Sequence, residues 1–158
     1  MNVKKTVALV VLCLIALPAF SSSDDEVDGI LTLAKAPPGV VFELLGDDDS
    51  LKMAIPKILE YIEELRTRFP ELAVAIVSHG DEQFALMAEK ADSYPEVHDQ
   101  VESLVEDQDV QVHVCATYAR WSGVSPEEFP EFVDVVPQGP SQIKDYVEFG
   151  YVLVEVDM

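Results

Sequence analysis

Short, almost continuous runs of apolar residues recur along the chain, separated by stretches in which apolar residues lie three or four apart. The short runs predict buried β-strands over residues 40–45, 72–77, 110–114, 132–136 and 151–156. Strands that alternate with helices are typical of right-handed crossovers and a parallel sheet. The pattern therefore predicts an α/β fold, a three-layer α/β/α sandwich with a mostly parallel five-stranded sheet.

The clearest predicted helix covers residues 51–69, where the apolar positions fall on one face at a spacing of 3.6. Asp49 or Ser50 can cap its start. Pro56 predicts either a kink or a later start, and Pro70 ends the helix. Further helical segments are predicted over 82–90 and 97–105, after Cys115, from Ser125 with a capping box, and from Pro140 to Gly150 at the C′ position.

The first 21 residues have the pattern of a cleavable signal peptide. Lys4 and Lys5 precede an unbroken apolar run over 6–16, and small residues occupy the positions before a cut at Ser22. The run is too short for a membrane-spanning helix. We therefore predict export to the periplasm, with no membrane attachment after cleavage. Residues 22–39 are acidic and then proline-rich, which predicts a mobile N-terminal arm with a possible edge strand at 30–33, followed by one domain over 40–158.

The charge of the chain excludes two classes of partner. Of its 158 residues, 30 are Asp or Glu and 10 are Lys or Arg, for a formal net charge of −20. Such a protein repels nucleic acid and anionic membranes, so neither is expected as a partner. The acidic residues are spread along the chain, which is typical of a solvated surface rather than an acidic tail.

Candidate chemistry lies where the predicted strands end. Cleavage would remove Cys13 and leave Cys115 as the single thiol, which is then buried, paired between chains, or reactive. Carboxyl ends of parallel strands share one sheet edge, where ligands bind in open α/β folds. This places Cys115 near His79, a candidate for activating the thiol, while Asp47–Asp49 on that edge would disfavour a second anion. The remaining candidate pocket residues are Asp47, Gly80, Thr117, Arg120, Gln138 and Gly139.

Metal binding is the weaker interpretation of these side chains. Asp47–Asp49 could hold Mg²⁺, but a capped, solvated loop fits better because no phosphate-cradling glycine loop accompanies it. Cys115, His113 and His79 include no closely spaced ligand pair of the kind typical of zinc sites. We therefore expect no metal and no other cofactor. His98 lies in a polar helical stretch and is expected to be solvated.

Three stretches resemble the DsrE/DsrF-like family. They are the strand ending in His79-Gly80, the strand ending in Cys115 with Gly123-Val124 downstream, and the tail VVPQGPSQIKDYVEFGYVLV. The resemblance covers roughly Val40 to Val154. It implies a five-stranded sandwich, assembly into trimers or hexamers, and sulfur chemistry in which a cysteine carries sulfur as a persulfide between proteins. That role is carried over to Cys115 alone.

Two functions from different classes remain open. One is a periplasmic, sulfurtransferase-like carrier that holds sulfane sulfur on Cys115 and exchanges it with donor and acceptor proteins or small thiols, without a cofactor. The other is a non-catalytic binding or assembly module with a buried structural Cys115. For a homo-oligomer, the candidate contacts are the aromatic residues Tyr118, Trp121, Phe129 and Phe132.

Overall fold

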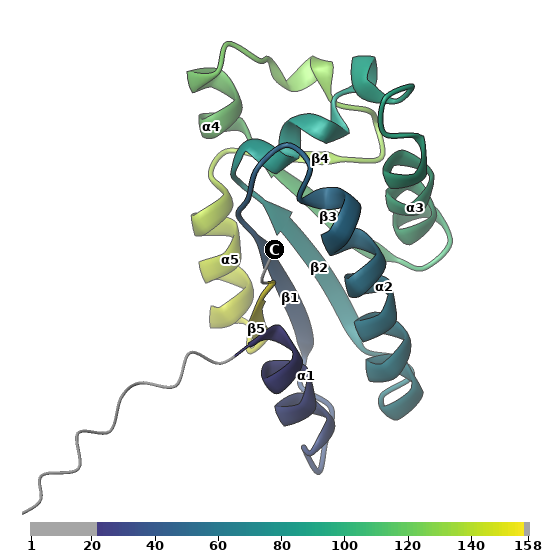
Figure 1. The fold of residues 1–158 in the computed structure, drawn as a ribbon. Coiled ribbons are helices and arrows are strands. Elements are labelled where there is room, and N and C mark those ends of the chain that lie inside the picture. Colours follow the sequence, from purple (N-terminus) through teal and green to yellow (C-terminus); the bar gives the residue numbers. More distant parts are fainter. Residues whose placement is uncertain (1–21, 157–158) are drawn as a thin grey trace, which may run out of the picture.

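A sheet of parallel strands forms the centre of the computed structural model, which describes residues 22–156 (Figure 1). The strands are β1 (Gly39–Leu44), β2 (Ala73–Ser78), β3 (Val110–Cys115), β4 (Asp134–Val136) and β5 (Val152–Glu155). Their order in the sheet is β4-β3-β2-β1-β5, and every pairing is parallel. The predicted sheet is confirmed, and its parallel strands bring their carboxyl ends to one edge. The predicted signal peptide lies outside the described residues.

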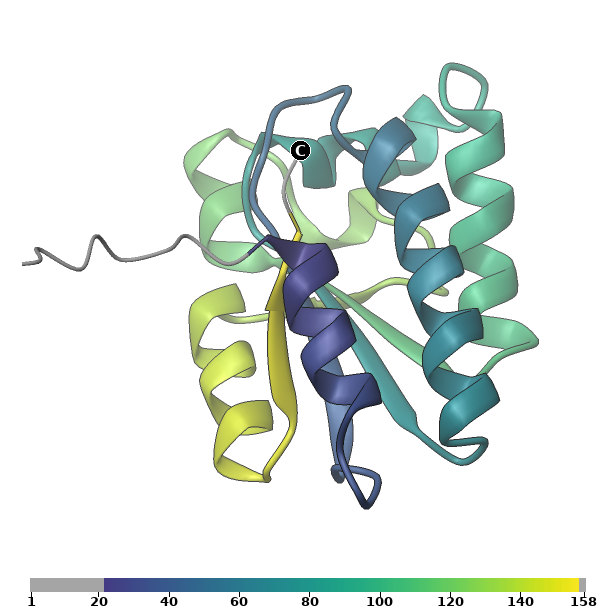
Figure 2. The same cartoon turned by 60° about the horizontal axis from the view of Figure 1, so that its bottom comes forward.

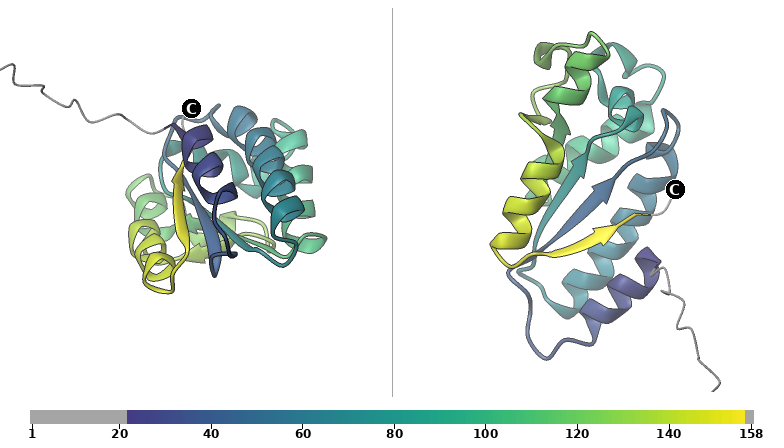
Figure 3. Two further views of the ribbon diagram at one scale, coloured as in Figure 1. Left: turned by 90° about the horizontal axis from the view of Figure 1, so that it is seen from below. Right: turned by 90° about the vertical axis from the view of Figure 1, so that its left-hand side faces the viewer.

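Helices cover both faces of this sheet, as the predicted three-layer sandwich requires (Figure 2). Helices α1 (Ser23–Leu31), α2 (Leu51–Arg68) and α3 (Pro95–Glu106) cover one face. Helix α5 (Gly139–Glu148) lies against the other, and α4 (Ala116–Trp121) follows directly after β3 (Figure 3). No helix within residues 22–156 has the length and apolar character needed to cross a membrane.

The two faces of the sheet bury very different amounts of apolar surface. In β1, Val40, Phe42 and Leu44 join the large core beneath α1, α2 and α3, whereas Val41 points to the α5 side. The α5 side holds a small cluster of Val41, Ala75, Val77, Ile143 and Tyr146. Beside it, Leu153 of β5 is only partly buried. The α5 face is therefore the thinly covered side of the sandwich.

The segments on either side of α2 differ in detail from their predictions. Helix α2 runs from Leu51 straight through Pro56, and Ser50 at its N-cap makes no capping bond. The Ser50 hydroxyl instead donates to Asp47 Oδ1 at 2.8 Å, so the side chain closes the preceding loop. Residues 82–90, expected to be helical, form two 3₁₀ turns, Asp81–Leu86 and Ala88–Lys90. They are separated by Met87, whose extended backbone interrupts the helical pattern.

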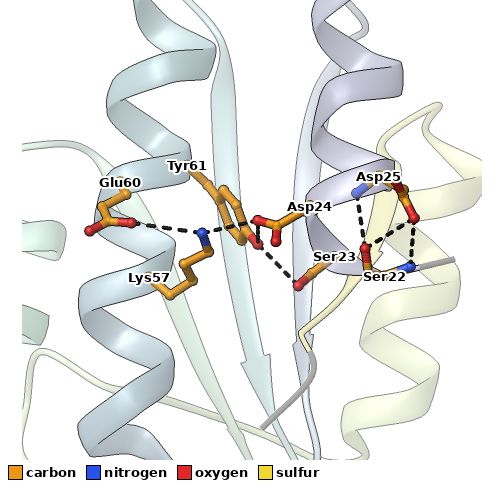
Figure 4. Close-up of polar contacts among 7 residues, drawn as sticks. All are labelled: Ser22, Ser23, Asp24, Asp25, Lys57, Glu60 and Tyr61. Carbon is orange, nitrogen blue, oxygen red and sulfur yellow. Dashed lines mark hydrogen bonds and ion pairs between the residues drawn. The ribbon is translucent and has the colours of Figure 1, made fainter.

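Helix α1 replaces the predicted mobile arm and edge strand. The Ser22 hydroxyl accepts from the Asp25 amide, and the Asp25 carboxylate accepts from the Ser22 amide, which forms a capping box (Figure 4). Val27 and Ile30, one turn apart, are buried in the main core. Three acidic residues lie in the first turn, where their negative charges interact favourably with the positive end of the helix dipole. The acidic composition therefore stabilises a helix here.

Polar contacts fix α1 to its neighbours. The Tyr61 hydroxyl of α2 lies 2.7 Å from Asp24 Oδ1 and 3.0 Å from Ser23 Oγ (Figure 4). Lys57 Nζ also contacts Asp24 Oδ1, at 2.9 Å. The Lys57 ion pair and the Tyr61 hydroxyl lower the pKa of Asp24. On the far side, the carboxylate of Glu26 accepts from the Glu155 amide of β5. Helix α1 is therefore an integral part of the domain.

Other turn predictions have mixed outcomes. The capping box at Ser125 is present, although it starts a 3₁₀ turn, Pro126–Glu128. Gly150 has a φ of +89° at the end of α5, as its predicted C′ position requires.

The prediction that His98 is solvated is wrong, because its ring is buried against Phe132 and Nε2 lies 3.0 Å from the Ala85 carbonyl. The residues that bury the His98 ring, Ala85 and Phe132, belong to other segments of the chain and not to α3.

A buried polar network lies beneath α5. His113 Nδ1 is 3.0 Å from Asp134 Oδ2 of β4, and Nε2 is 2.8 Å from the Tyr146 hydroxyl of α5. That hydroxyl is also 2.6 Å from Gln111 Oε1. Burial lowers the pKa of His113, although the Asp134 carboxylate acts in the opposite direction. Burial likewise raises the pKa of Tyr146 to about 12. The network therefore holds a neutral imidazole and a neutral phenol at neutral pH.

We expect His113 to make the fold less stable in mild acid. Its pKa is lower in the folded chain than the value of about 6.5 that it has when unfolded. Its contribution is therefore complete above about pH 6.5 and is lost as the pH falls below that value. Urea unfolding from pH 7.5 to about 5 should show this loss in the wild type and not in His113→Gln. Parallel pH profiles for the two proteins would contradict the expectation.

Candidate functional site

Cys115 lies at the junction of β3 and α4, beside a cavity of about 300 Å³. The cavity is lined by His79, Cys115, Thr117, Tyr118, Trp121, Gln138 and Pro140. These residues come from the ends of β2 and β3, from α4, and from the N-cap and first turn of α5. The predicted gathering of side chains at the carboxyl edge of the sheet is therefore confirmed for His79, Cys115, Thr117 and Gln138.

The cysteine itself is almost enclosed. Its side chain is buried, with a residue exposure of 4%. The backbone amide donates to Gln83 Oε1 at 2.8 Å, and the sulfur accepts from the Tyr118 amide at 3.5 Å. The contact with Tyr118 is the predicted one between the sulfur and the start of the next helix. Access to the sulfur is therefore through the cavity.

His79 is held by a carboxylate on the neighbouring strand. Its Nε2 lies 2.7 Å from Glu43 Oε1, and both side chains are largely buried. A carboxylate only accepts, so Nε2 carries the proton in this contact. In the neutral ring, Nδ1 is then the unprotonated nitrogen and can accept a proton. Cys115, His79 and Glu43 thus supply a thiol, a proton acceptor and a group that sets its tautomer.

A second, fully buried carboxylate shapes the loop that carries His79. Glu82 has 0% exposure, and its Oε1 accepts from the Ser78 hydroxyl and from the amides of His79 and Gly80. Its Oε2 accepts from the Gly46 amide of the β1–α2 loop at 2.7 Å. Each oxygen of the buried carboxylate is therefore satisfied by hydrogen bonds, and two loops at the sheet edge are joined through it.

The opposite wall of the cavity is fixed to the loop before α5. The Thr117 amide and hydroxyl both donate to the Pro137 carbonyl, at 3.2 and 2.8 Å. Gly139 lies directly behind His79, where a Cβ atom would stand 2.6 Å from His79 Cβ. Residues 137–139 therefore pack against both His79 and α4, and only glycine fits at 139.

Aromatic side chains form the rim of the Cys115 cavity. Tyr118 stacks on Phe84 and makes an edge contact with Trp121. Its hydroxyl donates to Asp81 Oδ1 at 2.8 Å, and this hydrogen bond raises the pKa of Tyr118. Trp121 is 78% exposed. An apolar ring at the mouth of a partly apolar cavity is a natural contact for a partner molecule.

Four of the predicted pocket residues do not line this cavity: Asp47, Gly80, Arg120 and Gly139. Asp47 is engaged with Ser50 in the β1–α2 loop, and Gly80 packs against the Glu82 carboxylate. Arg120 lines a separate hollow with Gly123 and Pro126, because a helical residue five positions after Cys115 faces away from it. Among the aromatic residues proposed for subunit contacts, Phe129 is buried in the main core.

Two functional residues were missed at the level of sequence. Glu43 looks like one polar residue in an apolar strand, and its alternation with Val41 and Phe42 does place it on the α5 face. Glu82 is one of many acidic residues, and its complete burial depends on loops that are distant in sequence. The first could have been found from strand alternation, whereas the second carried no distinguishing local signal.

The described residues contain no cluster of three or more histidine, cysteine or acidic side chains that could hold a metal ion. Asp47 and Asp49 make loop and helix contacts: Asp47 accepts from the Asp49 amide, and Asp49 pairs with Lys52. His113, considered above as a metal ligand, is engaged by Asp134 and Tyr146.

We expect Gly139→Ala to disturb both the fold and the site. The added methyl group would meet His79 Cβ at 2.6 Å and Val77 Cγ1 at 3.4 Å, so His79 must move. Such overpacking should lower the free energy of unfolding by about 1–3 kcal/mol. Gly29→Ala in α1 is the matched control, because no atom lies within 4 Å of its new Cβ. Urea unfolding measures the free energy of unfolding of both variants, and equal values would contradict the prediction.

Comparison with known proteins supports the fold. No protein-family profile matches the sequence, and no curated protein matches it significantly. Among solved structures, MTH1491 from Methanobacterium thermoautotrophicum, described as of unknown function, is 21% identical, with a TM-score of 0.59 over 73% of this chain and 96% of its own. The ychN protein from E. coli is 16% identical, with a TM-score of 0.58 over 74% and 97%.

A third structure, the conserved protein BT1422 of unknown function from Bacteroides thetaiotaomicron, is 10% identical, with a TM-score of 0.51 over 75% of this chain and 95% of its own. The first two neighbours have DsrE-like folds. At these identities the similarity concerns the fold alone. The chain therefore shares the fold of these two proteins.

Proposed function

We propose that this protein is a periplasmic, sulfurtransferase-like carrier of the DsrE/DsrF-like family that holds sulfane sulfur as a persulfide on Cys115. The observation that carries the proposal is that Cys115 and His79 line the same cavity. Glu43 contacts His79 from the neighbouring strand and fixes the tautomer of its ring. The resemblance of the strand ends and the C-terminal tail to that family adds independent support. Donor and acceptor are sulfur-carrying proteins or small thiols.

The transfer needs only a thiolate, a proton acceptor and access. His79 Nδ1 takes the proton of Cys115, and the thiolate attacks the outer sulfur of a donor persulfide, R–S–SH. The new bond joins Cys115 Sγ to that sulfur, the S–S bond of the donor breaks, and R–S⁻ leaves as a thiolate that His79 can protonate. In the second half, an acceptor thiolate attacks the outer sulfur of Cys115 and releases the Cys115 thiolate. No net oxidation or cofactor is required.

A non-catalytic binding or assembly module is the second candidate, favoured by one observation. Cys115 is only 4% exposed, as expected of a structural thiol. Alkylation by a small reagent such as iodoacetamide distinguishes the two. A carrier should be modified at Cys115 in the native protein, through the cavity. Modification only after unfolding would remove the carrier proposal and leave the module.

We include a homo-oligomer in the proposal. Apolar side chains are exposed on α4 and α5: Trp121 at 78%, Phe149 at 75% and Val147 at 45%. Val147 and Phe149 lie in and directly after α5, on the thinly covered side, and Trp121 lines the Cys115 cavity. Trimers or hexamers are what the family resemblance implies. The net charge of −20 opposes assembly, and salt screens that repulsion.

The oligomer should therefore be more stable against dissociation at high salt. Light scattering across a salt series measures this directly. The expected result is an increase in the oligomeric fraction with ionic strength, with Phe149→Ser as the variant that weakens it. A monomer at every salt concentration would remove this part of the proposal.

The periplasmic location rests on the proposed cleavage before Ser22. That cut leaves the capping box of Ser22 and Asp25 complete, since both residues belong to the mature chain. The new α-ammonium group would lie beside the acidic first turn of α1, where the Ser22 nitrogen is 3.4 Å from Asp25 Oδ2. N-terminal sequencing of the protein from its host tests the cut, and an intact Met1 would contradict it.

A further inference from the structure

A second cavity, of about 470 Å³, lies at the opposite, amino-terminal edge of the sheet. It is bounded by the end of α2, the turns that lead into β2 and β3, and the tyrosines at the end of α5 and the start of β5. Its volume falls within the range of about 300–1,000 Å³ that is typical of small-molecule sites. The cavity shares no lining residue with the one at Cys115.

The polar groups on its walls are held in place before any ligand binds. Arg66 donates from Nε to the Leu72 carbonyl at 3.3 Å and from Nη1 to the Gln108 carbonyl at 2.8 Å. These bonds use two of the five N–H donors of a guanidinium, so three remain. On the facing wall, the amide of Gln111 is held by the Tyr146 hydroxyl, which the buried His113 supports from behind. Such pre-organisation reduces the entropy lost on binding.

Charges of both signs face this cavity without pairing to each other. No ion pair joins Arg66 to a carboxylate within residues 22–156, although the lining also includes Glu71, Asp107 and Asp109. Tyr146 and Tyr151 add an aromatic wall, with ring centroids 4.8 Å apart. A ligand that satisfies the whole lining must carry an anionic group, a cationic group and an apolar portion.

We infer that the amino-edge cavity binds a small zwitterion of the α-amino-acid type with an apolar side chain. Arg66 receives the carboxylate through its remaining N–H donors, as guanidinium groups do. The acidic side chains of the Asp107–Asp109 turn receive the ammonium group. The tyrosine pair contacts the side chain. This site is separate from Cys115 and does not depend on the function proposed there.

Titration with L-phenylalanine and two blocked derivatives tests the inference. Amide NMR spectra of the full chain should show shifts at residues 107–111, with dissociation constants from the titration. N-acetyl-L-phenylalanine lacks the ammonium group, and L-phenylalanine amide lacks the carboxylate. Each should bind about tenfold more weakly than the zwitterion, since each loses one charge-assisted contact. Equal affinities, shifts elsewhere, or no binding of L-phenylalanine at millimolar concentration would overturn the inference.

Variants then assign the two charges. Arg66→Gln should weaken L-phenylalanine about tenfold and leave L-phenylalanine amide unchanged. The matched control is Arg68→Gln on the same helix, because Arg68 donates to the Leu33 carbonyl and does not line the cavity. Asp109→Asn supplies the opposite test and should weaken L-phenylalanine and its amide, but not the N-acetyl derivative. Asparagine tolerates the φ of +53° at this position, so folding is preserved. Unchanged affinities in both variants would overturn the assignment.

Discussion

Replacing Glu82 by alanine is expected to lower the free energy of unfolding by at least about 3 kcal/mol. The carboxylate is fully buried and accepts four hydrogen bonds, from the amides of Gly46, His79 and Gly80 and from the Ser78 hydroxyl. Its removal leaves several buried donors without acceptors and separates the loops after β1 and β2. Urea unfolding, followed by circular dichroism, measures the loss.

Two further variants make this test specific. Glu82→Gln keeps one carbonyl oxygen but places an amide N–H₂ opposite the Gly46 amide, so an intermediate loss is expected. Glu89→Ala is the matched control, because Glu89 is exposed on the next 3₁₀ turn. A loss for Glu82→Ala no larger than that for Glu89→Ala would show that the buried carboxylate does not hold the two loops together.

His79→Ala is expected to slow the reaction of Cys115 with a small alkylating reagent about a hundredfold at neutral pH. The variant removes the proton acceptor in the Cys115 cavity and leaves the thiol and its contact with the Tyr118 amide. Glu43→Gln should slow the reaction by a smaller factor, about tenfold, since the ring remains but its tautomer is no longer fixed by a carboxylate. The rate of alkylation across pH, followed by mass spectrometry, measures both effects.

Glu155→Gln is the control for Glu43. Glu155 pairs with Glu43 in the β1–β5 register, but its side chain is exposed and makes no contact with His79. Its variant should react like the wild type. Nitrogen NMR of the His79 ring gives a readout that is independent of activity, because loss of Glu43 should shift the neutral ring away from the Nε2–H tautomer. Unchanged tautomer and rate in Glu43→Gln would remove the positioning role of Glu43.

The strand pattern could be predicted from the sequence because the strands are mostly apolar and bounded by breaks. Successive side chains of a strand point to opposite faces of the sheet, which places Val41 and Glu43 on one face and Phe42 on the other. Cys115 and His79 could be brought together from topology alone, since parallel strands end at one edge. Strand topology fixes the edge on which a residue lies but not the direction of its side chain, which is why Arg120 was placed wrongly.

Helix α1 was missed for a different reason. Its first turn is so acidic that composition predicted a solvated arm, although Ser22 and Asp25 have capping-box spacing and Val27 and Ile30 lie one turn apart. The stabilising partners, Tyr61 and Lys57, are more than thirty residues away in α2. Burial of Glu82 and His98 likewise depends on distant segments. Such tertiary effects override local composition.

The central claim is that Cys115 carries sulfane sulfur, and intact-mass spectrometry tests it most directly. Native protein in a Cys13→Ser background, in which Cys115 is the only thiol, is exposed to a sulfane-sulfur donor such as a glutathione persulfide. The account predicts one added sulfur per chain, absent from the further Cys115→Ser variant and removed when an acceptor thiol is supplied. A native protein that gains no sulfur, or that gains it equally without Cys115, would contradict the account.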